Sequence, residues 1–297
     1  MGKKKNDATK ENQKLLDRYI VHCKNKGLTQ ESIRAICQND LRVFLEFIGD
    51  KKLSKVTHHD IEDFLIYCSE VRKNGVEAIS RKFSSISQFF KVLVNQEAKG
   101  ITRNPLDKLD KPKKRKKVRP YLTYEEYEKL IEYVDEENDL RGAALISLMF
   151  SSGCRLSEIH QLNIDSLNFS TRRFKVLGKG EKERICFFSE DAKNRIQKYL
   201  DSREDVLKAL FVSRENRRWS KKSIQDYVKK LGIESGIQKN VHPHLFRHGR
   251  AMYLLKQGVA LEVIQRLLGH ESIATTQIYA HMETDAVQKV IDAVEAA

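Results

Sequence analysis

Residues 265–282 read QRLLGHESIATTQIYAHM, and this stretch near the C-terminus decides much of what the chain can be. Gly269 is expected to end one helix and Ser272 to cap the next. The second helix carries Thr275 and Tyr279 on one face, since positions three or four apart share a face. His270 then lies in the sharp turn between the helices. The stretch therefore predicts two short helices that bring a histidine and a tyrosine together.

An arginine motif lies upstream, in the run SGCRLSE of residues 152–158. Arg155 stands where a helix is predicted to begin, and Glu158 follows three positions later. Residues at this spacing share a helix face, so Glu158 can orient the guanidinium. An isolated pair of this kind is usually a surface ion pair. Only its occurrence together with the other motifs in this chain favours a functional interpretation.

A second arginine motif, HPHLFRH, occupies residues 242–248. Pro243 suits the first turn of a helix, from which His244 and Arg247 project on one face. Arginine forks bind the non-bridging oxygens of a phosphodiester bidentately. The histidines also suggest zinc, but the glutamate of an HExxH motif is absent and Arg247 would place a cation beside the metal. The pattern favours a phosphate site without metal.

A lysine and a tyrosine complete the set of candidate reactive groups. Lys179 stands between glycines in Gly178–Glu181, a predicted hairpin turn that can approach a ligand closely, although most such lysines are only solvated. A tyrosine oxygen can attack phosphorus, and a lysine or histidine can protonate a departing oxygen. Most tyrosines are packing residues. Tyr253 has apolar neighbours and Tyr227 lies on a polar helix, so Tyr279 is the candidate nucleophile.

The order and spacing of these motifs resemble the tyrosine recombinase/integrase family, most closely its two-domain, Xer-type members. The resemblance covers nearly the whole chain, and its strongest parts are the HxxR pair and the LGHxxIxTTxIYxH stretch. It implies an N-terminal, SAM-like, core-binding helical bundle that clamps DNA, followed by a mixed α/β catalytic domain. It also implies strand cleavage and rejoining through a 3′-phosphotyrosyl intermediate, with no metal, ATP or other cofactor.

The resemblance also implies a role for each site residue. Tyr279 attacks the scissile phosphate, Lys179 protonates the 5′ leaving oxygen, and His244 accepts the phenol proton. A phenol has a pKa of about 10, so it needs nearby cations and an acceptor to react at neutral pH. The groups expected to stabilise or orient the phosphate are Arg155, Arg247 and His270, with Glu158 behind Arg155. The implied partners are double-stranded DNA with paired half-sites and a homotetramer, or a heterotetramer with a paralogous recombinase.

Composition agrees with a DNA-binding protein. The chain has 297 residues, 40% of them hydrophobic and 32% charged, which suits two globular domains. Its net charge of +14 favours a nucleic-acid partner, although some soluble proteins are basic without one. Five scattered cysteines without a CxxC are expected to be reduced packing residues. There is no apolar run of about 20 residues and no secretory signal pattern, so we expect a cytoplasmic protein without membrane contact.

A linker separates the two expected domains. Pro105, Pro112 and Pro120 surround the run KKRKKVR, a mixture that few helices or strands tolerate. We therefore predict a core-binding domain at 1–105, a basic linker at 106–120 and a catalytic domain at 121–297. Basic residues of the linker and of the hairpin are expected to hold the DNA backbone: Lys113, Lys114, Arg115, Lys116, Lys117, Lys182 and Arg184.

Hydrophobic periodicity predicts a mostly α fold with one small antiparallel sheet. Apolar residues at three- and four-residue spacing indicate N-terminal helices at 10–25, 29–48, 58–72 and 76–98. Thr57 and Thr123 are expected to cap helices. Short β-prone runs predict strands at 166–169, 173–177 and 184–188. The remaining helices are expected at 123–134, 143–150, 190–202, 220–235, 242–257, 260–268, 272–281 and 284–295.

Two other functions remain open on the sequence. A type IB topoisomerase uses similar chemistry but relaxes supercoils as a monomer, without a specific site. A non-catalytic DNA-binding protein is the other alternative, if the site does not assemble. Within the recombinase interpretation, chromosome-dimer resolution and mobile-element integration or excision are both compatible with the motifs.

Overall fold

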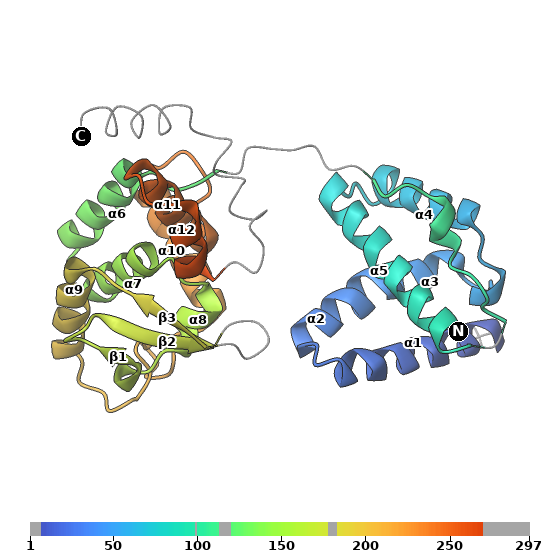
Figure 1. The fold of residues 1–297 in the computed structure, drawn as a ribbon, viewed down its shortest axis with the longest axis horizontal. Coiled ribbons are helices and arrows are strands. Elements are labelled where there is room, and N and C mark those ends of the chain that lie inside the picture. The colour runs from blue at the N-terminus through green and yellow to red at the C-terminus, as the bar shows by residue number, and fades with distance from the viewer. Residues whose placement is uncertain (1–6, 99, 113–119, 178–182, 270–297) are drawn as a thin grey trace. The chain divides into compact units, whose positions relative to one another are not determined.

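The computed structural model describes residues 7–98, 100–112, 120–177 and 183–269. The chain divides into two compact units, Met1–Lys117 and Val118–Ala297, and each has its own apolar core (Figure 1). None of the described helices is both long and apolar enough to cross a membrane. All five cysteines are buried, as expected of packing residues.

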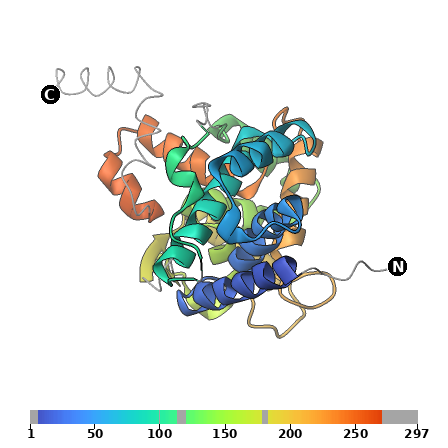
Figure 2. The same ribbon diagram turned by 90° about the vertical axis from the view of Figure 1, so that its right-hand side faces the viewer.

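The N-terminal unit is a helical bundle, as the periodicity predicts. Its α-helices are α1 (Asp7–Asn25), α2 (Gln30–Arg34), α3 (Arg42–Ile48), α4 (His58–Glu70) and α5 (Val76–Asn95). The 3₁₀ turns η2 (Leu53–Lys55) and η3 (Pro105–Lys108) connect or follow them. Helix α5 is central, since α1, α4 and η3 all pack against it (Figures 1 and 2). Phe44 meets Phe64 and Phe90 edge to face in this core.

The predicted helix at 29–48 is not uniform. Its middle, η1 (Ala35–Leu41), is π-helical, and the Arg42 N–H bonds the carbonyl of Cys37 five residues back. Such wide turns occur mostly as short interruptions within α-helices. This one carries Asp40, a carboxylate with no exposed surface that faces α5. Periodicity finds the helix but not the change of pitch within it.

The packed N-terminal unit continues beyond residue 105, where the linker was predicted to begin. Leu106, in η3, is only 3% exposed and belongs to the core of this unit, and Leu109 packs against the same core. Asn104 stabilises the turn, because its side chain accepts a hydrogen bond from the Leu106 N–H. The predicted start of the linker at 106 is therefore too early. The basic residues at 113–117 lie outside the described residues.

The C-terminal unit is mostly helical with one small sheet, which confirms the predicted fold class. Its elements before and within the sheet are α6 (Tyr124–Glu136), α7 (Leu140–Ser152), α8 (Leu156–Gln161), η4 (Ile164–Ser166), β1 (Leu167–Asn168), β2 (Arg173–Leu177) and β3 (Glu183–Phe187). The described helices after the sheet are α9 (Glu190–Asp201), α10 (Lys221–Glu234), α11 (Pro243–Lys256) and α12 (Leu261–Leu268). The predicted helices at 272–281 and 284–295 lie outside the described residues.

The sheet is antiparallel, in the order β1-β2-β3, with Leu167 opposite Phe174 and Lys175 opposite Ile185. Strand β1 is shorter than predicted, because Ser166 ends the 3₁₀ turn η4 and does not pair in the sheet. Helix α7 is the buried centre of the unit, and α6, α9, α11 and β3 pack against it (Figure 1). The sheet and α11 are thereby fixed on one scaffold.

Candidate active site

The C-terminal end of α12 is the point at which three arginines meet. The carbonyl groups of its last two residues, Leu267 and Leu268, and of the capping residue Gly269 each accept a hydrogen bond from a different guanidinium; we call these groups the carbonyl trio. Carbonyls at a helix C-terminus lack helical partners and carry partial negative charge, so cations stabilise them. The donors are Arg184 Nη1 to Leu267 at 2.7 Å, Arg247 Nη2 to Leu268 at 2.6 Å and Arg155 Nη2 to Gly269 at 3.2 Å.

Arg155 immediately precedes α8 and contacts Glu158 as the sequence predicts. The Arg155 backbone N–H donates to Oε2 of Glu158 at 2.7 Å, and its Nη1 donates to Oε1 at 3.0 Å. Glu158 is nearly buried, with 4% of its side chain exposed, whereas 35% of the Arg155 side chain is exposed. Glu158 therefore fixes a guanidinium that remains partly open to a ligand.

Arg247, on α11, is the buried member of the group and is 5% exposed. Its Nη1 donates to the Gly153 carbonyl at 2.9 Å. Burial, followed by the neighbouring charges of Arg155 and Arg184, lowers the pKa of Arg247 to about 10. Three guanidiniums thus share Glu158 as their nearby carboxylate among the described residues, an arrangement that favours binding of an anion.

His244 lies one turn before Arg247 on α11 and keeps an exposed surface. Partial loss of solvation, followed by the charges of Arg247 and Arg155, lowers the pKa of His244 below its usual value of 6.5. The lowered pKa favours the neutral form of the ring. A neutral imidazole beside two arginines can accept a proton.

The two arginine motifs meet because α7 ends close to α12. Gly153 caps α7 with φ of 60°, a left-handed conformation that favours glycine. A Cβ at this position would lie 2.5 Å from Cδ2 of Leu268, so any other residue would force the buried Leu268 side chain to shift. Arg155 follows two positions later and thereby reaches the carbonyl trio.

The position of Arg184 does not fit its predicted role as a ligand of the DNA backbone. It lies on β3 with only 13% of its side chain exposed, and its Nη2 donates to Glu158 Oε2 at 2.7 Å. Burial alone would lower its pKa, but Cys154, Cys186 and Glu158 raise the pKa of Arg184 above its ordinary value. A spacing argument treats all basic residues of the hairpin alike and cannot tell which of them turns inward.

The structure thus brings together Arg155, Glu158, Arg247, His244 and Arg184, the group we call the arginine cluster. The remaining candidates lie outside the described residues: Lys113, Lys114, Arg115, Lys116, Lys117, Lys179, Lys182, His270 and Tyr279. His270 follows Gly269 directly in the chain, and Lys179 stands in the connection from β2 to β3. No group of three potential metal ligands occurs among the described side chains.

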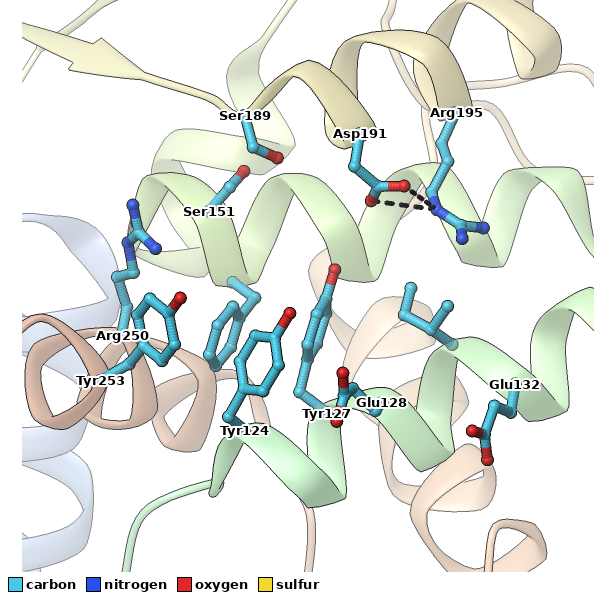
Figure 3. A pocket seen from close by; sticks show the side chains of 12 residues that line it. Tyr124, Tyr127, Glu128, Glu132, Ser151, Ser189, Asp191, Arg195, Arg250 and Tyr253 are labelled. Carbon is cyan, nitrogen blue, oxygen red and sulfur yellow. Dashed lines mark hydrogen bonds and ion pairs between the residues drawn. The ribbon is translucent and has the colours of Figure 1, made fainter. Parts of the chain in front are cut away.

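A separate cavity of about 400 Å³ lies among α6, α7, α9 and α11 (Figure 3). Tyr124, Tyr127 and Tyr253 line one side, and Arg250 stands at one end. On another wall Asp191 accepts a hydrogen bond from Nε of Arg195 at 2.9 Å. The sequence gives no signal for this cavity, because its walls come from four helices distant in the chain. None of the arginine cluster lines it.

A helical unit, a mostly helical unit with a three-stranded sheet, and two arginine motifs that meet at the end of α12 are typical of the tyrosine recombinase class. Comparison with known proteins agrees. The phage integrase family model matches residues 120–285, and the model of the phage integrase N-terminal SAM-like domain matches residues 15–99. The chain therefore belongs to the phage integrase family.

Individual relatives match nearly the whole chain. Tyrosine recombinase XerC of Psychromonas ingrahamii is 30% identical over 295 residues, which cover 94% of this chain and 95% of the relative. Tyrosine recombinase XerD of Oceanobacillus iheyensis is 32% identical over 270 residues, 86% and 89% of the two chains. The XerH site-specific recombinase, solved with a palindromic difH substrate after cleavage, shares the fold with a TM-score of 0.76 at 17% identity over 99% and 98% of the chains.

Proposed function

We propose that this chain is a site-specific DNA recombinase that cuts and rejoins double-stranded DNA through a 3′-phosphotyrosyl intermediate. Membership of the phage integrase family and relatives that are tyrosine recombinases support this function. The observation that carries it is the meeting of Arg155 and Arg247 at adjacent carbonyls, those of Gly269 and Leu268. Two guanidiniums so close together can bind both non-bridging oxygens of one phosphodiester.

The chemistry begins with attack of the Tyr279 oxygen on the scissile phosphorus. A phosphorus–oxygen bond to Tyr279 forms as the bond to the 5′ oxygen breaks, which leaves a free 5′-hydroxyl. The 5′-hydroxyl of a second strand then attacks the phosphotyrosine and releases Tyr279. One phosphodiester is exchanged for another through a phosphotyrosine of similar energy, so the exchange consumes no ATP.

Two proton transfers accompany each exchange. His244 accepts the phenol proton, a role supported by its lowered pKa beside Arg247 and Arg155. Lys179 donates a proton to the departing 5′ oxygen, since alkoxides leave poorly without one. Arg155, Arg247 and His270 stabilise the charge that develops on the phosphate oxygens, because donors fixed in advance need no reorganisation during the reaction.

The DNA contacts and the assembly of copies on DNA are also proposals. The net charge of +14 supports binding of a polyanion, and the linker segment Lys113–Lys117 is proposed to follow the phosphate backbone. XerH, which shares this fold, was solved on a palindromic substrate. We propose that two half-sites recruit two copies and that four copies, identical or paralogous, form the exchanging complex.

The C-terminal stripe Val287, Val290, Ile291 and Val294 is proposed to couple neighbouring copies in that complex. If each copy donates this segment to the next copy, the contact is a heterologous interface, and a series of such contacts can close into a ring. Deletion of residues 285–297 should leave single half-site binding intact and abolish cooperative filling of two half-sites, as measured by gel shift. A truncated protein that still binds cooperatively and exchanges strands would restrict the segment to packing within its own chain.

The test of the proposed function is covalent capture of DNA. A duplex that the full-length protein selects from a random-sequence library is nicked near the cleavage point, so that the cleaved end diffuses away. Wild type should give a protein-linked, labelled strand on a denaturing gel. Tyr279→Phe should give none while binding the duplex within about 1 kcal/mol of wild type, because one hydroxyl adds little to a wide interface.

The matched control is Tyr253→Phe, which removes a hydroxyl from the cavity of the same unit. This variant should retain the covalent band, since Tyr253 lies outside the arginine cluster. A band that survives in Tyr279→Phe would move the nucleophile elsewhere. Absence of any covalent product in wild type, with binding intact, would favour a non-catalytic DNA-binding protein.

A further inference from the structure

We infer that Arg184 is a positioning residue, which holds the end of α12 against Glu158 and so sets where the chain leading to His270 and Tyr279 begins. The inference deepens the proposed function and rests on it for its catalytic consequence. The contacts that carry it join three elements distant in sequence, β3, α8 and α12. Arg184 lies 83 positions from its acceptor Leu267 and 26 from Glu158.

Both terminal nitrogens of the Arg184 guanidinium are engaged by the protein, whereas its buried Nε has no hydrogen-bond partner among the described residues. Its Nη1 donates to the Leu267 carbonyl at 2.7 Å and approaches Cys186 Sγ at 2.9 Å. Its Nη2 donates to Glu158 Oε2 at 2.7 Å and lies 3.8 Å from Cys154 Sγ. Both sulfurs are buried and lie 3.3 Å apart, so they wall off this side of the guanidinium from solvent.

The stem of Arg184 also fits closely against the end of α12. A Cβ at Gly269 would lie 2.6 Å from the Arg184 Cδ, so any other residue here would push the Arg184 side chain from its present position. Gly269 adopts φ of 65° and ends α12 directly before His270. Arg184 therefore touches both the backbone that ends α12 and the carboxylate that orients Arg155.

The three arginines bound to the carbonyl trio differ in what DNA would do to them. Arg155 is partly exposed and is proposed to turn donors toward the scissile phosphate. Such a turn would weaken its bond to the Gly269 carbonyl, whereas Arg184 is 13% exposed and keeps its bond to the Leu267 carbonyl. Arg247 also bonds the end of α12, at the Leu268 carbonyl, but it is proposed to bind the phosphate together with Arg155. Arg184 is thus the arginine of the cluster that can hold α12 without contacting DNA.

Loss of Arg184 should slow the reaction, because catalysis tolerates only small displacements of the reacting groups. A displacement of about 1 Å in reacting groups can reduce a rate about 100-fold. Without Arg184, the carbonyl of Leu267 loses its donor and Glu158 loses one of its two guanidinium partners. The start of the segment bearing His270 and Tyr279 is then no longer fixed relative to Arg155.

The test uses the full chain with Arg184→Met, which keeps the length of the stem without its donors, and Arg184→Lys, which keeps a charge. Arg217→Met is the matched control, because Arg217 is an exposed arginine of the same unit with a weak ion pair of 3.9 Å. Single-turnover cleavage of the selected, nicked duplex is measured against DNA concentration. Arg184→Met should reduce the maximal rate about 100-fold and change the half-saturating DNA concentration less than about threefold. Arg184→Lys should fall between Arg184→Met and wild type.

A leaving-group substitution separates positioning of α12 from positioning of the hairpin that carries Lys179. With sulfur as the 5′ bridging atom the leaving group needs no proton, so Lys179→Ala should recover its rate. Arg184→Met should remain slow on the same DNA. Recovery by Arg184→Met, or a loss of binding as large as its loss of rate, would overturn the inference.

A structural readout keeps the inference testable even if the proposed function fails. Hydrogen exchange of the peptide covering 261–269 should accelerate in both Arg184 variants, while peptides from α6 and α10 exchange as in wild type. If wild type cleaves no DNA and this acceleration still occurs, the proposed function fails and the anchoring role stands. Unchanged exchange at 261–269 in Arg184→Lys, the variant that best preserves folding, would overturn the inference.

Discussion

Two buried carboxylates, Asp40 in the N-terminal unit and Glu158 in the C-terminal unit, are each bound by two cationic side chains, but the two sets serve different purposes. Among the described residues, the side-chain partners of Asp40 all lie on α5: Arg81 at 2.9 Å, Lys82 at 3.2 Å and Ser85 at 2.8 Å. Glu158 is bound by Arg155 from the start of its own helix and by Arg184 from β3. The first set joins two helices, whereas the second lies where four elements meet.

The two sets also differ in how their charge is balanced. In the Asp40 set one cation, Arg81, is 54% exposed, so its charge is solvated as well as paired with the carboxylate. In the Glu158 set a third guanidinium, Arg247, is buried beside Arg155 and Arg184 with only carbonyl oxygens as its described partners. An excess of buried positive charge costs stability, and proteins keep such groups chiefly at functional sites. The difference distinguishes a structural ion cluster from one prepared for an anion.

The largest expected effect on stability is from Asp40→Ala. Lys82, with 5% of its side chain exposed, would keep only the Asn39 carbonyl as a described partner. Breaking a buried ion pair from one side costs about 3–5 kcal/mol, so the N-terminal unit should unfold at lower denaturant. Circular dichroism should report this loss.

Fluorescence of Trp219, the only tryptophan, reports the C-terminal unit separately. Its transition should stay near that of wild type in Asp40→Ala. Arg81→Ala is the control and should cost under about 1 kcal/mol, because Arg81 is exposed. Equal losses in the two variants would contradict the assignment of Asp40 as a buried structural centre.

Arg247→Lys should have the next largest effect, chiefly on the reaction. An ammonium cannot reproduce a planar fork on a phosphate, and loss of one preorganised donor costs about 2.7–4 kcal/mol, or 100- to 1,000-fold in rate. Single-turnover cleavage measures this loss. The control is Arg250→Lys, one turn later on α11 and outside the arginine cluster, which should retain most activity. Cleavage near wild type in Arg247→Lys would remove Arg247 from the site.

Glu158→Gln is the direct counterpart of the Asp40 change and should be smaller. The amide keeps one acceptor oxygen but turns donors toward Arg155 or Arg184, so one charged hydrogen bond worth about 1.5–3 kcal/mol is lost. The Trp219 transition should move to lower denaturant and the cleavage rate should fall. If stability falls without any change in rate, Glu158 resembles Asp40 and the comparison between the two sets fails.

The smallest expected effect is on the pH dependence of cleavage and of folding stability. The pKa of His244 lies below 6.5, so its neutral form, the proton acceptor, persists to lower pH than in an ordinary histidine. The acid limb of kcat/KM, which reports the free enzyme, should therefore fall below pH 6.5. Folding stability should also decrease as pH falls through 6.5, because the unfolded chain binds a proton there before the folded one. His244→Gln should flatten the limb, and an unchanged limb would assign it to another group.

Much of the helical architecture could be predicted, because the signals are local. The capping pair Thr123 and Glu126 begins α6 with hydrogen bonds of 2.8 and 3.2 Å, as its spacing indicates. Pro243 opens α11, and Gly269 closes α12 in the left-handed conformation. The π-helical segment around Asp40 was missed, although a carboxylate between apolar Cys37 and Leu41 was a signal of a buried polar partner.

The sequence by itself determined the family, the order of the two units and the contact of Arg155 with Glu158, since motifs and three-residue spacings depend on a few neighbouring positions. Only the tertiary structure decided that Arg184 turns inward, that α12 ends in a carbonyl trio and that a cavity opens among four helices. Arg155 lies 114 positions from Gly269, and Arg184 lies 83 from Leu267. Whether such distant groups meet is set by the packing of α7, α11, α12 and β3, which periodicity along the chain does not encode.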